Sequence, residues 1–240
     1  GAVGFVLYAS VFLVPLHAQN LLGYSALETG KVLAPMGIAT LLTMPIAGAL
    51  VNRVDARLLL AFGTVMLAWS AHMLAGLNLD AGFWHLTWPR AVQGLALGFI
   101  FVPLTTATMT GISQEQTNAA SGFFNLARNI GGSVGIALAG TFISRRSQFH
   151  QQGIIENLSA YKPETGGALD LAARVLAGRG IDPAQVDHGA LGVLYAEVQR
   201  QSAMNAFLDD YWLLALIAVL TIPLILLLKK PDPTAATMGH

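Results

Sequence analysis

The stretch WPRAVQGLALGF, Trp88 to Phe99, places an arginine and a glutamine at the start of a run that is otherwise apolar. The whole chain has this apolar character, since 54% of its 240 residues are hydrophobic and 11% are charged, with a mean hydropathy of +0.59. Soluble domains carry about a quarter charged residues. The composition therefore predicts a membrane protein, and Arg90 is the residue that this prediction has to explain.

Long uncharged runs support the same prediction. Five runs have no charged residue and are long enough, or nearly so, to cross a hydrocarbon core of about 30 Å as helices. They are residues 1–27, 32–52, 58–79, 91–114 and 211–228. A sixth run, residues 119–143, is interrupted only by Arg128. Helices satisfy every backbone group in lipid, so the sequence predicts an all-α membrane protein with six transmembrane helices.

The spacing of these runs predicts three regions. Residues 1–143 hold transmembrane helices one to five, and residues 207–240 hold the last one and a cytoplasmic tail. Residues 144–206 are rich in charges and turn sequences, and we expect them to form a polar domain outside the membrane. Within it, the apolar face from Leu169 to Leu176 predicts a short helix that ends near Gly178. Asp182 and Pro183 predict the start of a second helix that leads into the last span.

The charges and motifs exclude several classes of protein. The 13 basic and 13 acidic residues cancel, so the chain offers no basic field for nucleic acid. It has no cysteine and no H-E-x-x-H, P-loop or G-x-G-x-x-G motif, so we expect neither a metal site nor a cofactor. GGSVG matches a serine-hydrolase pattern at Ser133, but that pattern requires a strand before the serine. We expect a helix there, and no enzyme.

Basic residues in the short loops predict the orientation. Arg53, Arg57, Lys229 and Lys230 fall on one side of the six expected spans. Short loops rich in lysine and arginine face the cytoplasm, so the carboxy terminus is expected there. Residues 144–206 then lie on the outer side, where His17, Asp209 and Asp210 are also expected.

Arg90 has two possible environments. An arginine at the centre of a spanning helix costs about 2.5 to 3.5 kcal/mol on insertion scales. It can extend to the interface beside Trp84 and Trp88, or it can face the interior of the bundle with a partner. Gln93 falls close to the same helix face, and Gly94 allows a neighbouring helix to approach. These two residues favour the interior.

Two motifs carry a resemblance to a known family. R-x-x-Q-G, read as Arg90, Gln93 and Gly94, resembles the fourth-helix motif of major facilitator transporters, whose arginine is associated with proton coupling in antiporters. GALVNRVDAR is similar to the G-x-L-x-D-R-x-G-R gating loop of that family. This loop matches at Gly48, Leu50, Arg53 and Arg57, whereas Asn52 replaces the usual acid and Asp55 the usual glycine.

Two longer segments resemble one branch of that family. PLHAQNLLGYSALETGKVLAP (residues 15–35) and AASGFFNLARNIGGSVGIALAG (residues 119–140) look like spans of the 14-span drug:proton antiporters of the EmrB/QacA type. The resemblance implies the carboxy-terminal half of a proton-driven multidrug efflux antiporter in the bacterial inner membrane. We therefore expect the natural start to lie upstream, in an amino-terminal half. The expected partners are small amphipathic or cationic substrates, protons, membrane lipid and a periplasmic adaptor protein.

The resemblance and the polar residues together name candidate site residues. Arg90 and Gln93, with Asn125 and Arg128, form the expected proton-coupling network. Arg128 can also lie at the cytoplasmic mouth, bonded to carbonyls or lipid phosphate. The candidates for substrate contact, which can also simply pack or face lipid, are Gln19, Asn20, Lys31, Met36, Met44, Phe99 and Phe101. Two other functions stay open: a non-transporting scaffold with a partner-binding loop, and an importer of the same fold.

Overall fold

The computed structural model describes residues 2–109, 116–158, 163–178 and 182–227, and within these residues it is helical without strands. The all-α fold predicted from the sequence is therefore confirmed. The helices, in chain order, are α1 (Ala2–Asn20), α2 (Ala26–Val51), α3 (Ala56–Ala75), α4 (Phe83–Met109), α5 (Thr117–Asn157), α6 (Pro163–Gly178) and α7 (Pro183–Leu226).

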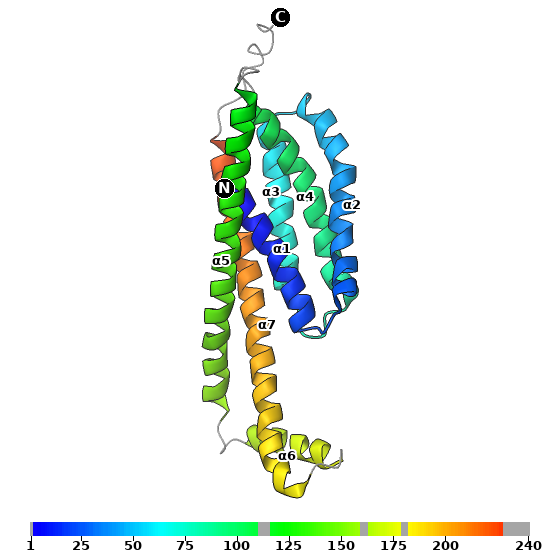
Figure 1. Cartoon of the computed structure of the whole chain (residues 1–240), viewed down its shortest axis with the longest axis vertical. Helices are drawn as coiled ribbons and strands as arrows, with labels where there is room; N and C mark the ends of the chain where they lie inside the picture. Colours follow the sequence, from blue (N-terminus) through cyan, green and yellow to red (C-terminus); the bar gives the residue numbers. More distant parts are fainter. Residues whose placement is uncertain (1, 110–115, 159–162, 179–181, 228–240) are drawn as a thin grey trace, which may run out of the picture.

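The first four helices form a bundle with one end of α5 and one end of α7 (Figure 1). Helix α4 packs against both α2 and α3, α7 packs against α3 and α5, and α1 packs against α5 and α7. Apolar side chains from these helices fill the centre. The largest of them that are fully buried are Leu13, Leu74, Leu86, Ile100 and Leu214.

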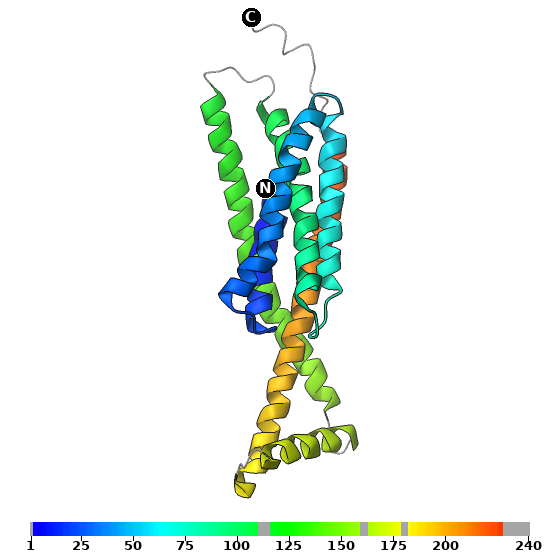
Figure 2. The ribbon, with the colours of Figure 1, turned by 90° about the vertical axis from the view of Figure 1, so that its right-hand side faces the viewer.

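Helices α5 and α7 are far longer than a membrane span. They have 41 and 44 residues, or about 60 and 66 Å at about 1.5 Å per residue, twice what a hydrocarbon core of about 30 Å needs. The parts of both helices that lie within residues 144–206 extend beyond the bundle, and we call them the stalk. Figure 2 shows the two stalk helices crossing and then diverging, with α6 bridging their far ends.

The stalk differs from the expected separate polar domain, because both helices continue without a break through residues 143 and 206. The segment SRRSQFHQQ contains neither glycine nor proline, so nothing in it stops α5 at the edge of the apolar run. The short helix predicted around Leu169 is α6, which ends at Gly178 as expected, and α7 begins at Pro183 as expected.

Among the described residues, five helices are long and apolar enough to cross a membrane: α1, α2, α3, α5 and α7. Helix α4, which carries Arg90 and Gln93, is not among these five. It nevertheless lies within the bundle between α2 and α3. The chain is thus a multi-pass helical membrane protein, while the count of six spans stays a prediction.

The turn before α2 is closed by a capping box. The Glu28 N–H donates to the Ser25 hydroxyl oxygen over 3.3 Å, and the Ser25 N–H donates to the Glu28 carboxylate over 2.8 Å. These bonds satisfy backbone donors that the first turn of a helix leaves free. Gly23 turns the chain just before this cap with a φ of +71°, which favours glycine. Glu28 therefore fixes the start of α2.

Glycines allow two pairs of helices to approach closely. A Cβ at Gly94 would clash with the Met36 carbonyl oxygen and lie 2.8 Å from the Ala39 Cβ, so α4 meets α2 there. The Thr40 hydroxyl of α2 reinforces this contact by donating to the Gly94 carbonyl over 3.0 Å. On the other side of the bundle, a Cβ at Gly135 of α5 would lie 2.6 Å from the Phe5 carbonyl oxygen of α1. The close approach predicted at Gly94 is confirmed, and Gly135 gives a second close approach of the same kind.

Candidate functional site

Arg90 lies inside the bundle and not at its lipid surface. Its side chain is 0% exposed, and α4 directs it toward α1. There its Nη1 donates to the Ser10 hydroxyl over 2.9 Å and to the Gln93 side-chain oxygen, and its Nη2 donates to the Ser10 carbonyl. The arginine thus satisfies its terminal nitrogens with neutral oxygens from its own helix and from α1.

Gln93 completes this cluster. It is 1% exposed, and its Nε2 donates to the Ser10 hydroxyl over 2.7 Å. One turn of helix separates Arg90 from Gln93, so both face Ser10 from α4. Ser10, itself 3% exposed, accepts from both side chains and therefore joins α1 to α4. We call Arg90, Gln93 and Ser10 the arginine cluster.

The arginine cluster holds a positive charge without a carboxylate. Among the described residues, the ion pairs within 4.0 Å all involve Asp209, and none involves Arg90. The Arg90 Nε is also buried without a hydrogen-bond partner in the described part of the chain. Removing an ion from water is costly unless an opposite charge or hydrogen bonds compensate. Hydrogen bonds to neutral oxygens therefore compensate the buried charge of Arg90, and no opposite charge among the described residues pairs with it.

A second buried polar group lies beside the cluster. Tyr211 of α7 and His17 of α1 are both 0% exposed, and the Tyr211 hydroxyl lies 3.3 Å from the His17 Nδ1. The His17 ring also stacks on Phe207, with ring centroids 5.0 Å apart. The Tyr211 hydroxyl is close enough to the Arg90 guanidinium for the two to interact electrostatically. Polar side chains from α1, α4 and α7 thus meet in the core.

Comparison with known proteins identifies this architecture. Residues 1–136 match the family model described as Major Facilitator Superfamily. The chain belongs to the major facilitator superfamily. This confirms the resemblance that the sequence motifs carried.

Curated relatives within the superfamily are named for export and resistance. The chain is 28% identical to the multidrug export protein EmrB of Escherichia coli (strain K12) over 96% of this chain and 44% of the relative. It is 27% identical to the fatty acid resistance protein FarB of Neisseria gonorrhoeae, again over 96% and 44%. It is 31% identical to EmrB of Haemophilus influenzae over 68% and 32%. The chain spans less than half the length of these relatives.

Two residues expected beside Arg90 lie elsewhere in this major facilitator chain. Arg128 of α5 is half-buried, and its guanidinium lies over the Phe101 ring, 5.8 Å from the ring centre. Its Nε is buried without a partner among the described residues. Asn125 is exposed one turn earlier on α5. The structure therefore brings Arg90 and Gln93 together, whereas Asn125 and Arg128 lie apart from them on α5.

The expected gating loop has a structural task at the start of α3. Asp55, which replaces the usual glycine of the family motif, caps α3 by accepting from the Arg57 N–H over 3.0 Å. Asn52 ends α2, and both Asn52 and Arg53 are exposed. Gly48 is half-buried and no atom would lie within 4 Å of a Cβ there.

The candidates for substrate contact do not form one wall. Gln19, Asn20 and Lys31 are exposed near the turn between α1 and α2. Phe99 packs edge-on against Phe62 of α3, with ring centroids 5.1 Å apart, whereas Phe101 lies under Arg128 of α5. These two phenylalanines thus point to different sides of α4. On α2, Met36 is half-buried, while Met44 is 40% exposed.

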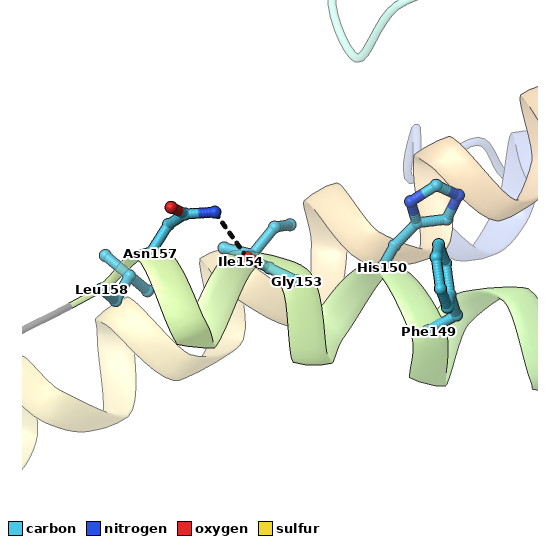
Figure 3. A pocket seen from close by; sticks show the side chains of 6 residues that line it. All are labelled: Phe149, His150, Gly153, Ile154, Asn157 and Leu158. Atoms are coloured by element: carbon cyan, nitrogen blue, oxygen red, sulfur yellow. Dashed lines mark hydrogen bonds between the residues drawn. The ribbon is translucent and has the colours of Figure 1, made fainter.

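A hollow lies on the stalk, away from the arginine cluster. It has a volume of about 490 Å³ and is lined by residues near the end of α5 (Figure 3). These are Phe149, His150, Gly153, Ile154, Asn157 and Leu158. His150 also contacts Asp209 of α7, so the hollow adjoins the ion pairs that join α5 to α7.

Sequence reasoning missed three residues of the buried polar region: Ser10, Asp210 and Tyr211. A serine or tyrosine within an apolar run carries no spacing signal that identifies its partner. Asp210, expected at the outer interface, is 1% exposed. The acidic pair in LDDYW was the available signal, because two carboxylates at the head of an apolar run are costly unless each has a defined environment.

Proposed function

We propose that this chain acts as the carboxy-terminal half of a proton-driven multidrug efflux antiporter in the bacterial inner membrane. An amino-terminal half would supply the opposing helical bundle, and small amphipathic or cationic compounds would exchange against protons. Membership of the major facilitator superfamily supports a transporter. The relatives named for multidrug export and fatty acid resistance support efflux.

The arginine cluster is the observation that carries proton coupling. A buried positive charge favours the ionised form of any acid brought next to it, and so favours release of that acid's proton. Arg90 donates hydrogen bonds to Ser10 of α1 as well as to Gln93 of its own helix. A movement of α1 relative to α4 would remove the Ser10 acceptors from Arg90, and the Arg90 guanidinium would then attract a carboxylate. Transporters of this kind work by rocking helix bundles about a central site, which provides such a movement.

The exposed face of α2 is the proposed place of substrate contact. Ile38, Leu41, Leu42 and Ile46 are all more than half exposed on this helix, and Met44 lies among them. Methionine adapts to ligands of different shape because its thioether chain is flexible and polarisable. Lys31, Gln19 and Asn20 would contact the polar end of such a ligand near the stalk.

The direction of transport has a direct test. The complete protein is reconstituted in proteoliposomes, a pH gradient is imposed, and movement of a cationic dye such as ethidium is followed together with proton flux. Antiport predicts that dye and protons move in opposite directions, and that collapsing the gradient stops the dye. Movement of both in the same direction would favour the importer of the same fold, and an absence of both would favour the scaffold.

The far end of the stalk supports a protein contact. A groove of about 360 Å³ lies between α6 and α7, and Leu171, Val175 and Val193 on its walls are each about half exposed or more. We propose that a periplasmic adaptor binds there.

A deletion of the far part of the stalk tests this role. Gln151 of α5 and Tyr195 of α7 are hydrogen-bonded to each other, so a short glycine-serine linker can join the two helices at these residues in place of residues 152–194. A pump should keep transport across its own membrane after this deletion, whereas a scaffold should lose its function.

A further inference from the structure

Two adjacent carboxylates of α7 have opposite environments. Asp209 has a side chain that is 31% exposed, and its Oδ2 accepts from Arg146 Nε over 2.6 Å and lies 2.6 Å from His150 Nε2. Asp210 is 1% exposed, and its Oδ2 is buried without a hydrogen-bond partner among the described residues. Arg146 and His150 of α5 thus both contact Asp209, and neither forms an ion pair with Asp210 in the described part of the chain.

The ionisable groups around Asp210 come from four helices. His17 of α1 bonds to Tyr211, the next residue along α7. His72 of α3 lies edge-on to Trp212, with ring centroids 5.9 Å apart. Arg146 and His150 of α5 are engaged by Asp209. Arg90 of α4 donates its hydrogen bonds to Ser10 and Gln93, and α6 contacts α7 further along the stalk, near Val193.

This arrangement leaves Asp210 with one stable form inside the closed bundle. An ionised carboxylate that is buried without a partner costs several kcal/mol, at least about 2, and the group avoids this by taking up a proton. The His17 Nε2 is likewise buried without a hydrogen-bond partner in the described part of the chain. The neighbouring Asp209 is partly exposed, so solvent is one residue away. Asp210 is both shielded and close to a source of protons.

We propose that Asp210 is a proton-binding site of the transport cycle, an inference that rests on the proposed antiport. Asp210 Oδ2 takes a proton from water at the stalk end of the bundle when α7 is open to solvent. In a later step of the cycle it releases that proton to water on the other side of the membrane, so that one O–H bond forms and later breaks. Asp210 adjoins Tyr211 in sequence, and the Tyr211 hydroxyl lies 3.3 Å from the His17 Nδ1. Asp210 therefore lies next to the buried polar groups that α1 and α7 share.

Proton binding can be measured without transport. Infrared difference spectra of the complete protein in detergent follow the carbonyl stretch of protonated carboxyl groups from about pH 6 to about pH 9, where ordinary surface carboxylates stay ionised. We expect a titrating carboxyl band in the unaltered protein that Asp210→Asn removes. Asp80→Asn, in the exposed loop between α3 and α4, should leave the band unchanged. A band that persists in Asp210→Asn would overturn the proposal.

Transport then separates this proposal from the proposed function. In proteoliposomes, Asp210→Asn should slow pH-driven ethidium movement by about tenfold or more, which corresponds to a free-energy change of about 1.4 kcal/mol. The variant should keep dye exchange in the absence of a pH gradient. Retained pH-driven movement would overturn the proposal. If the unaltered protein moves no dye, the proposed antiport fails, and the infrared titration alone decides whether Asp210 binds a proton. If Asp210→Asn does not fold, Asp210→Glu decides: it should keep the band at a changed midpoint, and an unchanged midpoint would overturn the proposal.

Discussion

Arg90 of α4 and Ser10 of α1 are joined by two hydrogen bonds, one to the serine hydroxyl and one to its carbonyl. The same hydroxyl accepts from Gln93 over 2.7 Å. Arg90 and Gln93 therefore share one acceptor of α1, the Ser10 hydroxyl oxygen, and Arg90 also uses the Ser10 carbonyl. The position of α1 relative to α4 therefore determines whether Arg90 can form its hydrogen bonds to Ser10.

Ser10→Ala should destabilise the protein. The change leaves donors of Arg90 and Gln93 buried without their acceptor, which costs about 1–3 kcal/mol. Thermal unfolding of the complete protein in detergent measures this as a lower Tm. Ser133→Ala, an exposed serine of α5, is the matched control and should leave Tm unchanged. Equal stability of the two variants would contradict the geometry of the cluster.

Gly94→Ala should separate α2 from α4. The added methyl group meets the Met36 carbonyl and the Ala39 side chain, and overpacking of this kind costs about 1–3 kcal/mol. Gly37→Ala on α2 is the control, because nothing lies within 4 Å of a Cβ there. The same unfolding experiment should show a lower Tm only for Gly94→Ala, and a matched loss in both variants would argue against close packing at Gly94.

Substitutions of Asp55, in the loop between α2 and α3, distinguish a helix-capping role from a charge-relay role. Asparagine also caps helices, so Asp55→Asn should keep both Tm and transport, whereas Asp55→Ala should lose about 0.5–2 kcal/mol of stability. The comparison needs both variants in the same detergent and the same vesicles. Loss of transport in Asp55→Asn at full stability would assign the charge of Asp55 to gating and not to the helix cap.

The side of the membrane that carries α6 can be labelled directly, because this chain has no cysteine. Leu171→Cys places a thiol on the exposed face of α6, where Leu171 is 64% exposed. If the stalk faces outward and the carboxy terminus is cytoplasmic, a membrane-impermeant maleimide should label this thiol in intact spheroplasts. The reference is Asn52→Cys in the loop between α2 and α3, which should react only after the cells are opened. The reverse labelling pattern would show that the stalk faces the cytoplasm, opposite to the predicted orientation.

Much of the fold could be predicted because apolar runs and cap residues are local signals. The uncharged runs predicted most helices, and Gly178 and Pro183 marked where α6 ends and α7 begins. The continuity of α5 and α7 into the stalk could not be predicted, since a charged segment indicates a change of solvent and not the end of a helix. The pattern of charged and apolar residues mainly indicates which segments lie in water or in lipid. It does not by itself indicate where a helix ends.

The candidate site could be predicted only in part, for a related reason. Arg90 and Gln93 are one turn apart, so their shared face follows from helix geometry alone. Their partner Ser10 is 80 residues from Arg90 in sequence, and only tertiary packing brings it there. Arg128 looked similar to Arg90 as an isolated charge in an apolar run. It lies apart because α5 presents it to Phe101 and not to the arginine cluster.

The central claim is that the arginine cluster couples protons to transport, and Arg90→Ala in the complete protein tests it most directly. The measurement is pH-driven ethidium movement in proteoliposomes containing equal amounts of inserted protein, with Arg145→Ala, an exposed arginine of α5, as the control. We predict that Arg90→Ala abolishes pH-driven movement while Arg145→Ala retains it. Full pH-driven transport by Arg90→Ala would contradict the account.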